Sequence, residues 1–123
     1  MRILVVDDDA LAGEMTAAIL EELGHEIVLA ENGVEAAELA GGGSCFDLVL
    51  SDLNMPMVSG IDLFRELRSQ QIMTPFILLT GDDPQTALAQ EPGLDGCLMK
   101  DFSLADQLPE IMATFVKPSE ERL

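Results

Sequence analysis

The segment DLVLSDLNMP, residues 47–56, joins an apolar run to an aspartate, Asp52, and then to a turn-forming stretch that contains Asn54 and Pro56. A short run of Val and Leu bounded by turn residues predicts a strand, and its nearly continuous apolar character indicates a strand covered on both faces. Such a strand would deliver Asp52 to the edge of a sheet. The turn would then let the chain leave without covering the carboxylate.

Four more apolar runs predict strands at residues 2–6, 26–30, 76–80 and 96–100, in addition to the one at 47–51. Helix-like segments follow them at residues 10–23, 34–40, 60–69, 81–93 and 102–117. This alternation predicts an α/β fold, a doubly wound five-stranded parallel sheet with helices on both faces and right-handed crossovers. In such folds the reactive groups gather beyond the carboxyl ends of the strands.

The helical segments differ in how clearly they are marked. In the first, Gly24 is expected to end the helix. The apolar residues of this segment repeat at helical spacing: Leu11, Met15, Ala18, Ile19 and Leu23. The fourth is short, with room for about two turns and with Pro84 suited to its first position. In the fifth, Ser103 is expected as the N-cap, and Pro109 beyond the first turn predicts a kink or a late start.

Length and composition indicate one globular domain. The chain has 123 residues, of which 48% are hydrophobic and 24% charged, and it contains no tract of the roughly 20 apolar residues that a membrane helix needs. Its start, MRILVVDDD, leaves no room for a signal peptide, so we expect a soluble, cytoplasmic protein. The two cysteines, Cys45 and Cys97, are expected to be small buried thiols rather than a disulfide.

The net charge is −17, with 23 acidic residues and only 6 basic ones. Such a surface repels phosphate backbones and anionic lipid, so we expect no direct binding of nucleic acid or membrane. A basic partner surface or a bound cation is favoured instead. The sequence leaves open whether two copies form a homodimer.

Five side chains stand at or next to the carboxyl ends of four predicted strands: Asp7, Asp8, Asp52, Thr80 and Lys100. In a parallel sheet these ends meet at one edge, so three carboxylates, a hydroxyl and an ammonium should converge. Close carboxylates repel one another by roughly 1 to 4 kcal/mol per pair. Mg²⁺ would remove that cost, because it takes carboxylate oxygens, keeps several waters and accepts phosphate oxygens. A phosphoryl group could then approach an Asp52 oxygen in line.

The order of ILVVDDD, DLVLSDLNMP with Gly60 after it, ILLTG and then Lys100 resembles the receiver domain of two-component response regulators. The resemblance implies a receiver domain over residues 1–117, followed by a tail at 118–123, and a flavodoxin-like sheet in the order 2-1-3-4-5. It implies a signalling phosphoacceptor rather than an enzyme that turns over a substrate. With no output domain in the sequence, we expect a stand-alone regulator, which could serve as a phosphorelay intermediate or a phosphate sink. The sequence leaves open whether the chain is a piece of a longer regulator.

The resemblance also implies roles for the residues at the sheet edge. In this family an aspartate after the third strand takes a phosphoryl group from a phosphohistidine on a sensor histidine kinase or a histidine phosphotransfer protein. Asp52 would be that phosphoacceptor, and Asp7 would act through a metal-bound water. Lys100 would pair with the phosphate, and Thr80 would turn to hydrogen-bond it. The implied Mg²⁺ ligands are Asp8, Asp52 and the backbone carbonyl of Asn54.

Two positions depart from the family pattern. Receivers usually carry a proline in a cis peptide after the lysine, whereas this chain has Asp101, for which a cis bond would cost about 3 to 4 kcal/mol. They also usually carry Tyr or Phe two or three residues before the lysine, where this chain has Cys97. With the short fourth helix, these departures put the usual output face, between the fourth and fifth helices, in question.

Three other functions share parts of the pattern. A phosphatase of the haloacid dehalogenase type could use VVDDDA and ILLT, but Leu11 stands where that type expects Thr or Val. A flavodoxin-type module is disfavoured, because the loop after the first strand is acidic and no Trp or Tyr is present to stack on a flavin. A receiver-like scaffold that is never phosphorylated stays open.

Overall fold

Five parallel strands form one sheet in the computed structural model, which describes residues 1–42, 46–55, 57–101 and 104–115. The strands are β1 (Arg2–Val6), β2 (Glu26–Ala30), β3 (Leu48–Asp52), β4 (Phe76–Thr80) and β5 (Gly96–Met99). Their order is β2-β1-β3-β4-β5, and every neighbouring pair is parallel. The predicted fold class and sheet order are therefore confirmed, with β3 shifted by one residue and β5 ending one residue earlier than predicted, at Met99.

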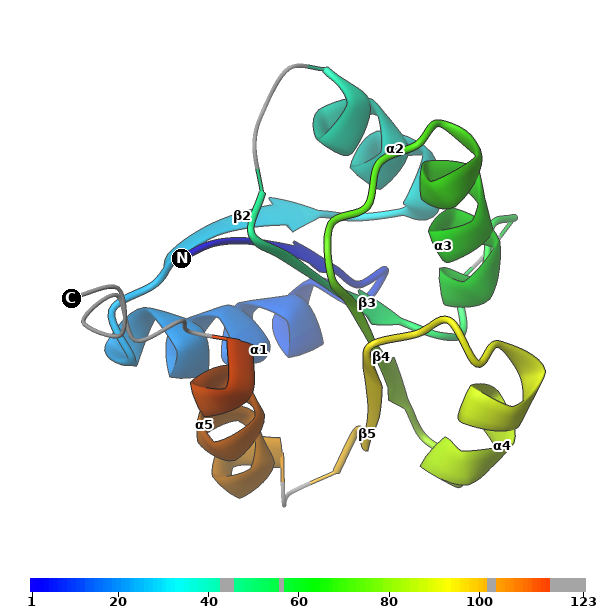
Figure 1. Ribbon diagram of the computed structural model, residues 1–123. Helices are drawn as coiled ribbons and strands as arrows, with labels where there is room; N and C mark the ends of the chain where they lie inside the picture. The colour runs from blue at the N-terminus through cyan, green and yellow to red at the C-terminus, as the bar shows by residue number, and fades with distance from the viewer. Residues whose placement is uncertain (43–45, 56, 102–103, 116–123) are drawn as a thin grey trace, which may run out of the picture.

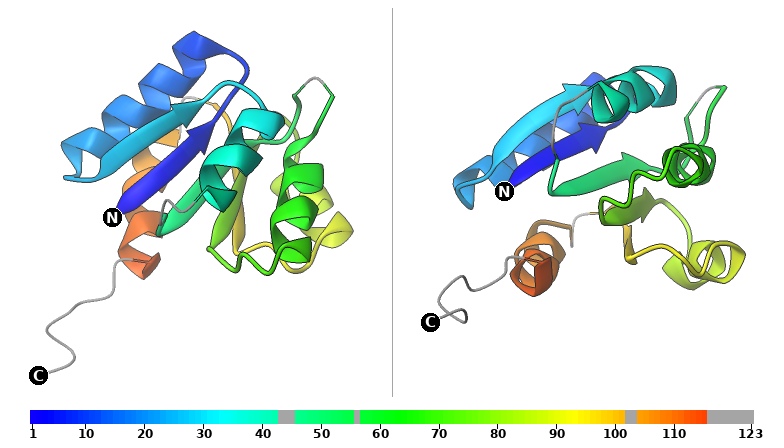
Figure 2. Two further views of the ribbon diagram at one scale, coloured as in Figure 1. Left: turned by 90° about the horizontal axis from the view of Figure 1, so that it is seen from above. Right: turned by 45° about the horizontal axis from the view of Figure 1, so that its top comes forward.

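Helices connect the strands and cover both faces of the sheet, as Figures 1 and 2 show. They are α1 (Ala10–Glu22), α2 (Gly33–Gly41), α3 (Gly60–Ser69), α4 (Pro84–Gln90) and α5 (Leu104–Phe115). Helices α1 and α5 lie together on one face, while α2, α3 and α4 lie on the other. Within the described residues, none of these helices combines the length and the apolar composition that a membrane span requires.

The alternation of side chains along the strands divides the core into two clusters. Ile3 and Val5 of β1 pack with Leu20 of α1 and Leu108 of α5. The intervening Leu4 and Val6 pack with residues on the opposite face: Ala36, Leu63, Phe64, Leu67 and Ala87. All five residues of both β3 and β4 are buried, as expected for strands covered on both sides.

Local signals in the sequence fix where the helices begin and end. The Asp9 side chain caps α1 by accepting hydrogen bonds from the backbone N–H groups of Leu11 (3.0 Å) and Ala12 (3.3 Å). Gly24 follows that helix with a φ of +93°, which a glycine adopts without strain. Asp83 caps α4, and Pro84 occupies its start, so the predicted short fourth helix is confirmed.

The apolar repeat of the first helix does not mark its buried face. Leu11 and Met15 are 68% and 62% exposed, whereas the buried residues of α1 are Gly13, Thr16, Ala17 and Leu20. Small residues let the helix approach the sheet closely, and a Cβ added at Gly13 would lie only 3.4 Å from the Asp7 Cβ. Two large apolar side chains of α1 are consequently left on the surface.

The last helix begins at Leu104 and runs through Pro109, so it does not start late. A kink at Pro109 stays a prediction. The expected N-cap, Ser103, the thiol Cys45 and the tail at 118–123 lie outside the described residues. Cys97 carries a free thiol that is only partly buried, against the apolar cluster on the face of the sheet covered by α2, α3 and α4.

Gly60 provides a test of the packing behind Asp52. A Cβ built at Gly60 would lie 2.5 Å from the backbone oxygen of Asp52 and 2.5 Å from Leu78 Cδ2. We expect Gly60→Ala to lower the free energy of unfolding by about 1 to 3 kcal/mol, because the clash involves backbone. Urea denaturation measures the change. Gly81→Ala is the control, since no atom of the described residues lies within 4 Å of its added Cβ. Equal losses for both variants would contradict the account.

Candidate functional site

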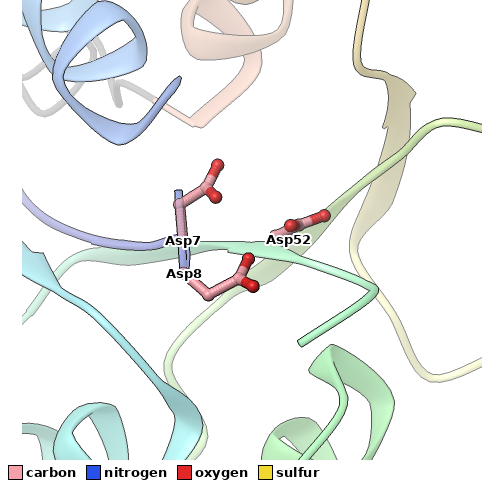
Figure 3. A group of neighbouring side chains, drawn as sticks. All are labelled: Asp7, Asp8 and Asp52. Atoms are coloured by element: carbon pink, nitrogen blue, oxygen red, sulfur yellow. The ribbon is translucent and has the colours of Figure 1, made fainter. Parts of the chain in front are cut away.

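The register of the sheet brings the predicted site residues to one edge. Val6 pairs with Ser51, so the residues that follow them, Asp7 and Asp52, are neighbours across β1 and β3. Thr80 ends β4 and pairs with Met99, the last residue of β5. Lys100 directly follows Met99 and therefore lies at the same edge of the sheet. Asp7, Asp8 and Asp52 accordingly lie close to one another at the carboxyl ends of β1 and β3 (Figure 3).

These three aspartates form a compact group of oxygen donors. One carboxylate oxygen from each of Asp7, Asp8 and Asp52 lies within 4.8 Å of the others. Asp7 and Asp52 are buried, at 4% and 7% exposed, whereas Asp8 is exposed to solvent. Ligand oxygens around an octahedral Mg²⁺ lie roughly 3 Å apart when adjacent and roughly 4 Å when opposite. Small side-chain movements would therefore let the group share one such ion.

Lys100 bridges two of the three carboxylates. Its Nζ lies 2.6 Å from Asp7 Oδ2 and 3.2 Å from Asp52 Oδ2. Burial lowers the pKa of Lys100, but the hydrogen bonds and negative charges of Asp7 and Asp52 outweigh it, so the net pKa is raised. The ammonium therefore stays charged. It neutralises one carboxylate and leaves the group with excess negative charge.

The pKa of the Asp52 carboxyl is raised above its ordinary value. Burial raises its pKa, the charge and hydrogen bond of Lys100 oppose the rise, and the negative charge of Asp7 adds to it. The backbone N–H of Asn54 donates a hydrogen bond that lowers the pKa, but the net direction is upward. A cation beside Asp52 would reverse this direction and keep the carboxylate ionised.

The two remaining predicted residues occupy different surroundings. Thr80 is 1% exposed, and its hydroxyl oxygen accepts a hydrogen bond of 3.0 Å from the backbone N–H of Asp82. Asn54 is exposed, two residues beyond Asp52, on the loop that leads to α3. Asp7, Asp8, Asp52 and Lys100 are thus brought together, while Thr80 is held by the loop after β4.

The structure also shows backbone supports that the sequence analysis missed. The N–H of Asp9 donates to Asp7 Oδ1 at 2.9 Å and orients that buried carboxylate. The N–H of Asp82 fixes the hydroxyl of Thr80. Any residue except proline supplies a backbone N–H, so no side-chain pattern could have identified these two positions.

The departures from the family pattern also have structural consequences. No cis peptide bond occurs in the described residues, so Lys100 and Asp101 are joined by a trans bond. Burial raises the pKa of the Cys97 thiol to about 11, which keeps it neutral at physiological pH. A small neutral thiol therefore takes the place that an aromatic ring usually occupies.

Comparison with known sequences identifies a family model and curated relatives that resemble this chain. The family model described as the response regulator receiver domain matches residues 3–112. The transcriptional regulatory protein CusR of Escherichia coli (strain K12) is 35% identical over 113 residues, covering 90% of this chain and 49% of its own length. The response regulator PmrA of Pseudomonas aeruginosa is 36% identical over 115 residues, covering 92% and 52%. The chain spans about half the length of these curated relatives.

Two solved structures of similar fold contain magnesium. Response regulator TrrA from Thermotoga maritima, solved in complex with Mg²⁺ and BeF, has a TM-score of 0.83 and 35% identity, and the match covers 94% of this chain and 98% of TrrA. The receiver domain of a sensor histidine kinase from Pseudomonas aeruginosa has a TM-score of 0.80 and 26% identity, covering 93% and 95%. Its structure has a magnesium ion coordinated in the active site cleft.

The sheet order, the acidic edge and the family match agree with one another. Receiver domains bind Mg²⁺ at an acidic site, and the oxygen donors of Asp7, Asp8 and Asp52 fit that ion. The chain belongs to the receiver domains of response regulators, the signalling domains of two-component systems.

Proposed function

We propose that this receiver domain accepts a phosphoryl group on Asp52 from a phosphohistidine. The observation that carries the proposal is the position of the Asp52 carboxylate, which lies 3.2 Å from Lys100 and within reach of an ion shared with Asp7 and Asp8. An Asp52 oxygen attacks phosphorus, the phosphorus–nitrogen bond of the donor breaks, and its electron pair stays on the imidazole nitrogen. The product is an acyl phosphate on Asp52.

The residues of the edge would divide the work as follows. Asp8 and Asp52, with the backbone carbonyl of Asn54, would hold Mg²⁺, and Asp7 would act through a metal-bound water. The ion supplies positive charge that offsets the phosphoryl oxygens. Lys100 would transfer one of its contacts from the carboxylates to a phosphoryl oxygen.

Thr80 would add a hydrogen bond to the transferred group. Its hydroxyl oxygen already accepts from the Asp82 N–H, so the hydroxyl proton remains available for donation. A threonine at the end of β4 stands beside β3, which carries Asp52. This arrangement supports Thr80 as a donor to a phosphoryl oxygen.

The phosphodonor would be a sensor histidine kinase or a histidine phosphotransfer protein that docks on α1. Leu11 and Met15 form an exposed apolar surface on this helix. A groove of about 360 Å³ between α1 and α5 is lined by Met15, Ile19 and Leu104 and reaches Lys100. A donor protein seated there would bring its phosphohistidine next to the acidic edge.

The role of the whole protein follows from its relatives only in part. CusR is named a transcriptional regulatory protein and is about twice as long as the matched region, so the expected stand-alone state stays a prediction. The expectation of no DNA binding rests on the charge of this chain alone and is not supported by the names of the relatives. A cytoplasmic location is part of the proposal. The proposed chemistry is modification of the domain's own Asp52 rather than turnover of a substrate.

Phosphorylation by a small donor tests the proposed acceptor. We expect acetyl phosphate with Mg²⁺ to add one phosphoryl group to the wild type and none to Asp52→Asn, because an amide cannot act as the nucleophile. Intact-mass spectrometry measures the adduct, and peptide mapping locates it. Asp106→Asn, which alters an exposed aspartate on α5, should be modified like the wild type. A phosphoryl group retained on the Asp52→Asn protein would show that another residue is the acceptor.

Thermal melting tests the metal ligands. Saturating Mg²⁺ should raise the melting temperature of the wild type by roughly 5 to 10 °C, because the ion binds only the folded acidic edge. Asp8→Asn should lose most of that rise, since it removes the exposed carboxylate of the group. Asp106→Asn should keep it. Equal responses in the wild type and Asp8→Asn would mean that the ion binds elsewhere.

A substitution on α1 separates docking from chemistry. We expect Leu11→Asp to slow phosphotransfer from a histidine kinase that phosphorylates the wild type by about tenfold, because it places a charge in an apolar contact. The reaction with acetyl phosphate should be unchanged. Met73→Asp, at an apolar residue that is 70% exposed elsewhere, is the control. A Leu11→Asp protein that reacts with the kinase at the wild-type rate would exclude this surface as the docking site.

A further inference from the structure

A second apolar groove lies between α2 and α3, which run side by side in Figures 1 and 2. Its volume is about 440 Å³, and its apolar lining comes from Val34 and Ala37 of α2, Val58 of the preceding loop and Leu63 of α3. Val34 is 48% exposed, so this apolar surface is open to solvent. A volume of this size accommodates one or two large side chains of a partner.

The packing of Val58 against the start of α2 fixes one wall of the groove. A Cβ added at Gly33 would lie 2.9 Å from Val58 Cβ, so the glycine at the start of α2 allows the loop after Asp52 to pack against that helix. The opposite wall is fixed by a capping box, in which Ser59 and Asp62 exchange hydrogen bonds at the start of α3. Both walls of the groove are therefore held in place.

Acidic side chains surround the apolar surface. Glu38 lines the α2 side, and Asp62 and Glu66 line the α3 side. The Asp62 and Glu66 carboxylates accept hydrogen bonds from the neutral donors Ser59 and Gln70, which leave their negative charges in place. Among the described residues that line the groove, none is a lysine or an arginine.

The arginines of α3 are engaged away from this groove. Arg65 forms a 2.7 Å ion pair with Glu91, and Arg68 lies 3.5 Å from Asp95 and stacks over the Phe64 ring. Glu91 follows α4, and Asp95 precedes β5. The groove consequently presents apolar surface framed by negative charge on both sides.

This charge pattern selects the kind of occupant. Nucleic acid and anionic lipid are repelled by the three carboxylates. A second copy of this chain would add further negative charge, since the whole sequence carries −17. An amphipathic helix with apolar residues on one stripe and Lys or Arg beside them satisfies both the groove and its rims.

We propose that the groove between α2 and α3 is a docking site for a basic amphipathic helix of a protein partner. One or two apolar side chains of that helix enter the space between Val34 and Leu63, and its basic residues pair with Glu38, Asp62 and Glu66. The surface is separate from the groove between α1 and α5 assigned above to the phosphodonor.

Binding of a synthetic basic peptide tests the proposal, because two variants can add the same negative charge inside and outside the groove. The probe is a fluorescent helix of about 14 residues, four turns, with leucines at helical spacing and lysines elsewhere. Val34→Glu should weaken its binding about tenfold at physiological ionic strength, although the variant is more acidic, because the apolar contact is lost. Met73→Glu adds the same charge at another exposed apolar residue and should not weaken binding. Fluorescence anisotropy measures both affinities.

Two further measurements complete the test. Glu38→Gln should weaken the peptide more than Glu110→Gln, which removes an exposed carboxylate from α5, and amide chemical-shift changes should centre on α2 and α3. Equal effects of Val34→Glu and Met73→Glu, or shift changes centred on other helices, would overturn the proposal. Sedimentation that shows a dimer dissociated by Val34→Glu would assign the groove to a second copy instead and would also overturn it.

Discussion

Mutual repulsion of carboxylates at the carboxyl edge of the sheet is the constraint on which the function of this domain depends. Asp7 and Asp52 are buried, and Asp8 lies beside them, so each pair costs roughly 1 to 4 kcal/mol. Lys100 is the one ammonium that the described residues bring to this group, and it offsets part of the cost. The pKa of Asp52 is nevertheless raised, chiefly because burial disfavours its charged form, and the negative charge of Asp7 adds to the rise. A divalent cation would complete the balance and would keep an Asp52 oxygen ionised.

The fold maintains this unfavourable arrangement because the strands that carry it cannot separate. β1, β3 and β4 are buried on both faces by two apolar clusters. At the start of α3, the Gly60 N–H donates a 2.9 Å hydrogen bond to the backbone oxygen of Leu53, the residue after Asp52. Elsewhere the described lysine and arginine residues are all taken up in ion pairs with acids, which leaves a surface dominated by unpaired negative charge. The surface of the described residues therefore favours basic partners, and we propose that the apolar grooves decide where they bind.

Much of this architecture was predictable because it depends on patterns that lie within single segments. Continuous Val and Leu runs identified the buried strands, and parallel strands necessarily bring Asp7, Asp52 and Lys100 to one edge. The orientation of α1 was not predictable from spacing, because Leu11 and Met15 form a regular helical stripe that faces solvent while Gly13 and Ala17 face the sheet. The hydrogen bond from the Asp82 N–H to the Thr80 hydroxyl was also not predictable, since its donor is a backbone group. Neither the close packing of a helix against a distant strand nor a hydrogen bond from a backbone N–H can be recognised from the types of the residues involved.

The most direct test of the central claim is a crystal structure with Mn²⁺ in place of Mg²⁺ and with beryllofluoride as the phosphoryl analogue, in which anomalous scattering locates the metal. The account predicts one ion bound to oxygens of Asp8 and Asp52, with beryllofluoride on Asp52 and Lys100 in contact with a fluoride. An anomalous peak away from the three aspartates, or beryllofluoride attached to another residue, would contradict it.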